Sequence, residues 1–472
     1  MTSKNTQSWL HSMQQGQQKF RQGDFEPAAR FYDAATKALP SRVEGWLNLG
    51  IAQVENGRPE TGLGSLEHAR CLNPDIMHTH QAIGDAQRQL GNWDAAITAY
   101  QRAVALQKTP MSLNQLAGAL RVARDARKSE GLYREALQMD PNFNLARVNL
   151  ATVQIELQKF SAARKLLSEL KNRSLSPLEA DEVACTGLAL ELYFFVKAGL
   201  EETLQSGNTD PLQQVLQKVP DSMLGVDPNM LEGISRYAES AKALTQQLEP
   251  IDSPMPGEWP LIEALFMIPM VETVTEYRKV KCELTAGLTP IGDLMESVNM
   301  VAVARAGRLT EGKLRDPIVA ETCLRYWHAL ATHNIPVISS GHFKMTNNLV
   351  GSSTQNRTRP HLVTGTVRKF FSDIYNTCPP GLARGFVCLM AICDIHPFED
   401  ANGRIALSML NRELEWAGLM PVLFSRKLGF GEQLSAGLRA VREANGDVSQ
   451  LVPLMRKGQR FAKEFCAELA QS

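Results

Sequence analysis

The sequence predicts an all-α protein in which a helical-repeat array is followed by a second helical unit. Three observations carry this prediction. Small residues recur with a 34-residue period in the first third of the chain, a breaker-rich stretch covers 249–257, and a helix–loop–helix pattern covers 391–418. A chain of 472 residues is also too long for one ordinary hydrophobic core, so two or three domains are expected.

The repeat array is predicted over residues 7–172. Small and aromatic or leucine side chains recur there at intervals of 34 residues, and weaker fourth and fifth repeats follow. Small residues let paired helices approach closely, and apolar residues fill the seam between them. The array resembles tetratricopeptide repeats, which implies a surface for a protein partner. The ladders are Gly16, Gly50 and Gly84; Gly23, Gly57 and Gly91; Ala35, Ala69 and Ala103; and Tyr32, Leu66 and Tyr100.

Residues 173–248 predict further helices without a clear period, and we interpret them as a bridge or cap to the array. The stretch 249–257 contains three prolines and a glycine, which interrupt helices, so it is the predicted domain boundary. A second helical domain is expected over 259–470, with its core at about 340–465. Its predicted helices include 361–376, 380–394, 402–417 and 431–444.

One segment of the second domain predicts β-structure. Residues 342–350 lie between two glycines, and the Thr-Asn-Asn sequence at their centre suits a turn. We therefore predict a β-hairpin at 342–350. His342 and Lys344 in this hairpin are candidate contacts to a target protein.

The composition excludes several classes of function. The formal net charge is zero, whereas a general nucleic-acid binder is usually basic. The eight cysteines form no C-x-x-C pair, which favours reduced thiols over a metal cluster. The polar N-terminus has no apolar signal core, and no apolar run reaches membrane-spanning length. The expected location is the cytoplasm, and an effector secreted without a cleaved signal would have the same features.

The helix–loop–helix pattern carries the candidate chemistry. Pro397 disfavours helical backbone at His396, so the first helix is expected to end at that residue. A second helix is expected to begin near Asn402. Its first backbone N–H groups lack partners, and the helix dipole adds partial positive charge, so this terminus suits a phosphate.

Charged and titratable side chains surround this predicted anion site. Gly403 permits close approach of a phosphate, and Arg404 adds a charged donor. Asp400 supplies an oxygen ligand for Mg²⁺, and His396 supplies a base that titrates near neutral pH. These groups together predict phosphoryl or nucleotidyl transfer.

Residues 396–404 are similar to the Fic (filamentation-induced) signature H-P-F-x-[D/E]-[G/A]-N-[G/K]-R-x-x-R. The resemblance implies transfer of AMP from ATP to a Ser, Thr or Tyr hydroxyl of a target protein, with release of pyrophosphate. It also implies that the hairpin at 342–350 is a flap that pairs with the target. Glycine rather than lysine at position 403 favours nucleotidyl transfer. The implied roles are His396 as base, Phe398 as loop anchor, Asp400 for Mg²⁺, and Ala401, Asn402, Gly403 and Arg404 for the nucleotide phosphates.

The sequence departs from the signature at Leu407, where the pattern has its second arginine. In the family that arginine contacts the outer phosphate of ATP. Other donors such as UTP or CDP-choline therefore stay open, as does a catalytically degenerate scaffold that only binds partners.

Overall fold

The computed structural model describes residues 3–471 except for 124, 245–247, 253–254, 269, 288, 336–338 and 347–356. The described residues divide into two compact units, one up to Ala184 and one from Cys185 onward. Both units are helical, and the β-structure among the described residues is an isolated antiparallel bridge between Pro250 and Leu419. The all-α prediction is therefore confirmed.

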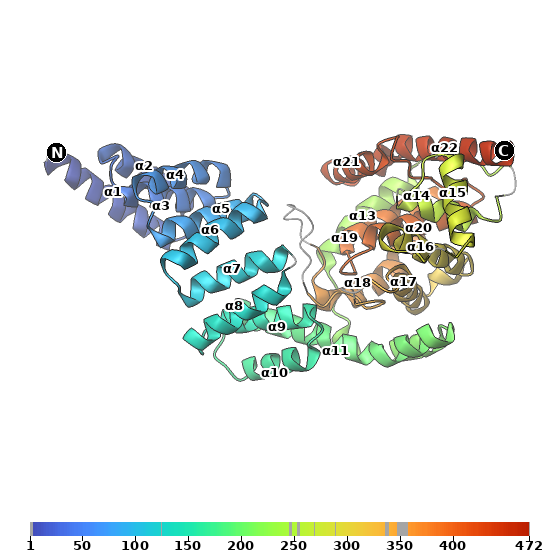
Figure 1. Ribbon diagram of the computed structural model, residues 1–472, viewed down its shortest axis with the longest axis horizontal. Coiled ribbons are helices and arrows are strands. Elements are labelled where there is room, and N and C mark those ends of the chain that lie inside the picture. Colours follow the sequence, from blue (N-terminus) through green and yellow to red (C-terminus); the bar gives the residue numbers. More distant parts are fainter. Residues whose placement is uncertain are drawn as a thin grey trace. The chain divides into compact units, whose positions relative to one another are not determined.

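The first unit is built from successive helices that pack in pairs, each pair lying against the next (Figure 1). This arrangement confirms the predicted repeat architecture. The helices are α1 (Ser3–Arg21), α2 (Phe25–Ala38), α3 (Val43–Glu55), α4 (Pro59–Leu72), α5 (Met77–Gln89), α6 (Trp93–Leu106), α7 (Pro110–Val122), α8 (Ala126–Met139), α9 (Asn144–Glu156) and α10 (Phe160–Leu170).

The small residues explain how the helices pair. A β-carbon at Gly16 would lie 2.7 Å from Cε1 of Tyr32, so glycine is required for α1 to reach α2 at this distance. A β-carbon at Gly84 would overlap the ring of Tyr100 in the same way, and Tyr100 is almost fully buried. The second glycine ladder lies at the turns, in left-handed backbone that glycine adopts without strain. These residues are Gly23 (φ 78°), Gly57 (φ 73°) and Gly91 (φ 77°).

Three helices follow the array: α11 (Pro177–Ser206), α12 (Asp210–Gln217) and α13 (Pro228–Lys242). By length and composition, α11 is apolar enough to cross a membrane, but half of its most apolar window is buried within the protein. Core helices meet the same criterion. Tyr237 of α13 is buried and reaches the neighbourhood of the candidate site, in a segment for which the sequence predicted no chemistry.

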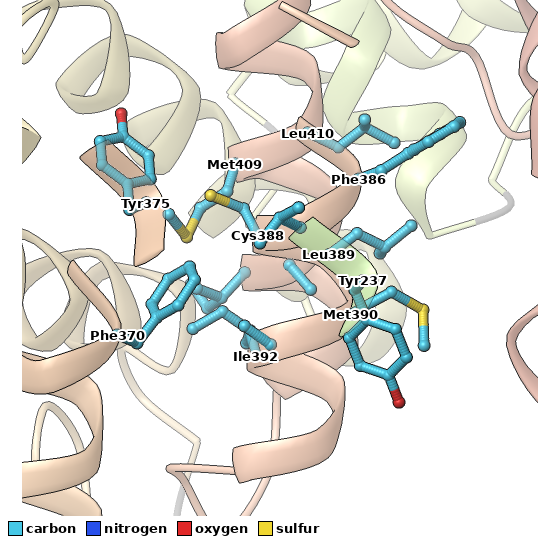
Figure 2. Packing of buried hydrophobic residues seen from close by; sticks show 14 of the residues in the cluster. Tyr237, Phe370, Tyr375, Phe386, Cys388, Leu389, Met390, Ile392, Met409 and Leu410 are labelled. Atoms are coloured by element: carbon cyan, nitrogen blue, oxygen red, sulfur yellow. The ribbon is translucent and has the colours of Figure 1, made fainter. Parts of the chain in front are cut away.

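The second unit is organised around one buried helix, α19 (Leu382–Ile395), of which every residue except Cys393 is buried. Figure 2 shows its side chains packed against Tyr237, Phe370, Tyr375 and neighbouring residues of the hydrophobic core. The other helices of this region are α14 (Trp259–Met267), α15 (Val274–Thr285), α16 (Gly292–Arg308), α17 (Pro317–Ala331), α18 (Val363–Lys369), α20 (Asn402–Trp416), α21 (Phe430–Glu443) and α22 (Val452–Gln471).

The predicted hairpin at 342–350 is not supported where the structure describes it. Residues 342–346 form no strand, and residues 347–350 lie outside the described part. The segment instead runs beside the loop after α19, where the N–H of Lys344 donates to Pro397 O at 2.8 Å. His342, Lys344 and Met345 are buried. The Thr-Asn-Asn sequence favours a local turn, and it carries no information about the distant backbone partner of Lys344, which is Pro397.

Candidate functional site

His396 lies at the corner where α19 ends. Its backbone is left-handed (φ 52°, ψ 62°), and its N–H donates to Ile392 O at 3.0 Å, which closes the last turn. Pro397 follows and cannot continue the helix. The predicted helix end at this residue is therefore observed, and the imidazole projects from a fixed corner rather than from a helix surface.

Two contacts hold the loop that follows. Phe398 is fully buried and stacks on His328 of α17, with ring centroids 3.9 Å apart and planes 1° apart. Asn402 clamps the loop from the other end, because its Oδ1 accepts from the Phe398 N–H and its Nδ2 donates to Phe398 O, both at 2.9 Å. The side-chain amide of Asn402 is thus committed to the loop.

The start of α20 is open. The first-turn N–H groups of an α-helix have no intrahelical acceptor. At α20 the N-cap residue, Ala401, is left-handed (φ 60°) and provides no side-chain cap for them. Gly403 is exposed, and a β-carbon at this position would meet nothing within 4 Å. The geometry therefore leaves room for an anion at the positive end of this helix.

Asp400 precedes this helix start and its side chain is about half exposed (48%). Its Oδ1 accepts from the Ala401 N–H at 2.6 Å and lies 3.9 Å from Nη2 of Arg404. Among the described residues no group of three or more His, Cys, Asp and Glu gathers that would hold a metal by protein ligands alone. A cation at Asp400 would need further oxygens from a bound phosphate and from water, which is the usual situation for Mg²⁺.

Arg404 has a partner that the sequence does not predict. Its Nη1 forms an ion pair with Glu296 of α16, and its side chain is 14% exposed whereas that of Glu296 is 34% exposed. The two residues are 108 positions apart, and no local pattern relates them. The charge of Arg404 is therefore partly neutralised by Glu296.

Asp394, two residues before His396, is the centre of a buried polar cluster. It accepts from Tyr237 Oη at 2.6 Å, from Arg442 Nη2 at 2.6 Å and from Arg357 Nη1 at 3.1 Å. Arg357 also donates to Cys393 O at 2.8 Å. The sequence does not predict this cluster, because its members come from four separate segments. It fixes the end of α19 and with it the position of His396.

The electrostatic surroundings keep His396 neutral. Burial lowers its pKa to about 4, and the positive charges of Lys344 and Arg357 act in the same direction. Asp400 acts in the opposite direction but more weakly. A neutral imidazole has a free lone pair, so the side chain is in the protonation state that a general base requires.

Comparison with known proteins characterises the first third of the chain. Residues 13–69, 82–142 and 120–175 match family models described as Tetratricopeptide repeat. This region is a tetratricopeptide-repeat array.

Among curated proteins, Protein FlbA of Caulobacter vibrioides is 27% identical over 163 residues, which are 34% of this chain and 27% of that protein. The chain thus spans about a quarter of the length of this relative. Among solved structures, MamA is 26% identical in sequence. The match covers 33% of this chain and 91% of the MamA chain, with a TM-score of 0.31. PilF of Pseudomonas aeruginosa is 11% identical. The match covers 46% of this chain and 92% of the PilF chain, with a TM-score of 0.35.

The tetratricopeptide repeats present a ladder of amide side chains on successive first helices. Nε2 of Gln81 donates to Oε1 of Gln115 at 2.8 Å, 34 residues away. Nδ2 of Asn149 donates to Oδ1 of Asn114 at 2.9 Å, 35 residues away. These amide pairs therefore link the first helices of adjacent repeats.

Proposed function

We propose that the protein is a Fic-type nucleotidyltransferase that moves AMP from ATP to a Ser, Thr or Tyr hydroxyl of a target protein. The observation that carries the proposal is the shared loop. A fixed, neutral histidine and an open helix N-terminus are the two ends of residues 396–402, with a half-exposed carboxylate between them. The tetratricopeptide array would bind the target protein.

In this proposal the transfer is a displacement at the α-phosphorus. The target oxygen forms a bond to that phosphorus while the bond to pyrophosphate breaks, and the hydroxyl proton passes to His396. The first-turn N–H groups from Asn402 to Arg404 would receive phosphate oxygens. The Arg404 side chain would exchange Glu296 for the donor, because both are anionic.

Magnesium fits the proposed site. Asp400 keeps one oxygen free of protein hydrogen bonds among the described contacts, and its side chain is half exposed. The ion, when bound, would neutralise charge on the phosphates. Ala401 would turn the chain so that Asp400 and the helix start face the same ligand, which its left-handed backbone supports.

The charges behind the corner support an anionic donor. Lys344, Arg357 and Arg442 gather there, and among the described residues Asp394 is the carboxylate that bonds to two of them. Cations removed from water are costly unless they are compensated. A polyphosphate would supply the missing negative charge.

The side chain at position 407 favours testing a second class of donor, one with only two phosphates. The side chain is partly buried and packs against the hydrophobic core of the second unit, so position 407 offers no cation to an outer phosphate. A donor with only two phosphates, such as CDP-choline, needs no such contact and would deliver phosphocholine. UTP is the nucleotide alternative, and a scaffold without catalysis is the third.

The test is labelling of candidate target proteins with ATP, UTP or CDP-choline in the presence of Mg²⁺. We expect labelling by one donor, and a loss of about 10²–10⁴-fold in His396→Ala, because the variant lacks the base. His333→Ala is the matched control, since His333 is exposed at the end of α17. The mass added to the target distinguishes AMP, UMP and phosphocholine.

Two results would reject parts of this proposal. Equal labelling by the intact protein and His396→Ala with every donor would remove His396 from the mechanism. Calorimetry without Mg²⁺-dependent binding of any donor would instead leave the catalytically degenerate scaffold as the better interpretation.

A further inference from the structure

Lys344 is a buried lysine beside the candidate base. The residue is only 2% exposed, and its Nζ donates to Ile395 O at the end of α19, at 3.5 Å. Its backbone N–H donates to Pro397 O at 2.8 Å. Lys344 therefore contacts the residue before His396 through its side chain and the residue after it through its backbone.

This lysine has no counter-ion among the described residues, because none of their carboxylates lies within ion-pair distance of it. Burial and the nearby charge of Arg357 lower the pKa of Lys344 to about 7. The partial negative charge at the C-terminus of α19 favours an ammonium there. A buried amine that lacks a salt bridge and touches both sides of a candidate base requires an explanation beyond packing.

We propose that Lys344 is a positioning residue for His396, which fixes the corner through its two contacts and keeps the imidazole unprotonated through its charge. This inference rests on the proposed role of His396 as base. It assigns to residue 344 a task in the reaction, in place of the contact to a target that its sequence position suggested.

The sign of the effect follows from the groups that face His396. Lys344 from segment 342–346 and Arg357 from the segment before α18 are positive and lower the pKa of the imidazole. Asp400 of the loop is negative and raises it. Removal of the Lys344 charge leaves Arg357 and burial, so the pKa of His396 should rise from about 4 toward its ordinary value.

The experiment compares the pH dependence of transfer in the full-length protein and three variants. Lys344→Met removes the charge and the hydrogen-bond donor, Lys344→Gln removes the charge but keeps a donor, and Lys344→Arg keeps the charge. We expect the acid limb of kcat to move up by about one pH unit in Lys344→Met and Lys344→Gln, because one like charge is lost. Lys344→Arg should keep the limb of the intact protein.

A second readout does not need the transfer reaction. Diethyl pyrocarbonate modifies neutral imidazole, and peptide mapping reports the rate at His396 as a function of pH. The midpoint of this rate should shift upward in the same two variants. Lys369→Met is the control, because Lys369 is exposed and pairs with Asp373 on the surface.

The two readouts separate the two hypotheses. An upward shift in modification without transfer by any donor would support the effect of the Lys344 charge on the imidazole of His396 and reject the proposed function. Transfer activity with unchanged midpoints in folded Lys344→Gln would overturn the role of Lys344. If Lys344→Met does not fold, the comparison of Lys344→Gln with Lys344→Arg gives the same decision.

Discussion

The two units of this protein are held together in different ways. In the tetratricopeptide array, contacts join helices that are neighbours in sequence, and ion pairs such as Arg30 with Glu26 lie at the surface. In the second unit, Arg412 and Glu263 form an ion pair 149 positions apart, and each side chain is only 2% exposed. Both units bury apolar side chains, but the array adds close contacts at small residues, whereas the second unit adds ion pairs that are almost fully buried.

This difference has a consequence for function. A solenoid tolerates changes in one repeat because each repeat contacts only its neighbours. In the second unit the cluster around Asp394 joins Tyr237, Arg357 and Arg442 directly behind His396. A change in these charges should therefore alter the stability of the unit and the position of the candidate base together.

The largest expected effect comes from Asp394→Asn. The change leaves the guanidinium groups of Arg357 and Arg442 without their carboxylate in a buried setting. We expect the free energy of unfolding of the second unit to fall by about 3 kcal/mol, as when one partner of a buried ion pair is removed. Hydrogen exchange followed by mass spectrometry resolves the two units, and peptides of the array should keep their protection.

Asp373→Asn is the matched control for this comparison. Asp373 pairs with Lys369 at 3.0 Å, and both side chains are about half exposed (51% and 53%). Loss of such a surface pair costs less than about 1 kcal/mol. Equal destabilisation by the two substitutions would show that buried charge does not distinguish the second unit.

The same contrast explains what the sequence could predict. The array was predictable because its contacts repeat every 34 residues. One glycine ladder marks the close helix pairings, as between Gly84 and Tyr100, and the other marks the turns. The helix end at His396 was predictable from Pro397, because proline acts on its immediate neighbour. These signals are local, and local physics determines them.

The polar partners of the candidate site were not predictable in this way. Glu296 meets Arg404 across 108 positions, and Asp394 meets Tyr237 across 157. The hairpin prediction was wrong for 342–346 because the backbone partner of Lys344 is Pro397, in a distant segment. Such contacts arise from tertiary packing, for which one sequence carries no periodic signal.

An intermediate effect is expected in the array from Gly84→Ala. The added methyl group would overlap the Tyr100 ring and force α5 away from α6, at a cost of about 1–3 kcal/mol. Gly64→Ala is the control with the opposite sign, because Gly64 lies on the exposed face of α4 with nothing within 4 Å. Alanine favours a helix interior over glycine by about 0.5–1 kcal/mol.

Destabilisation by Gly84→Ala and stabilisation by Gly64→Ala can be distinguished by denaturant unfolding, monitored by hydrogen exchange of peptides from α3 to α8. Gly84→Ala should lower protection in the array and leave peptides of α19 and α20 unchanged. If both glycine substitutions changed protection in the same direction, close packing at the ladder would not be the source of stability in this unit.

The smallest effect concerns the ion pair between Glu296 and Arg404. Glu296→Gln removes the negative charge that competes with a phosphate for Arg404, while the amide can still accept a hydrogen bond. Because Glu296 is one-third exposed, the pair contributes no more than about 1 kcal/mol, which corresponds to about fivefold in affinity. We therefore expect calorimetry to detect tighter binding of the magnesium–nucleotide complex, by up to about fivefold.

Glu283→Gln is the control for this prediction, since it removes the same charge from an exposed position on α15. The control separates a local effect on Arg404 from a general change in net charge. Weaker binding in Glu296→Gln would mean that Glu296 orients Arg404 toward the donor rather than competing with it. In that case the buried charges of the second unit would organise the site before the donor arrives, and the ion pair would belong to the binding surface itself.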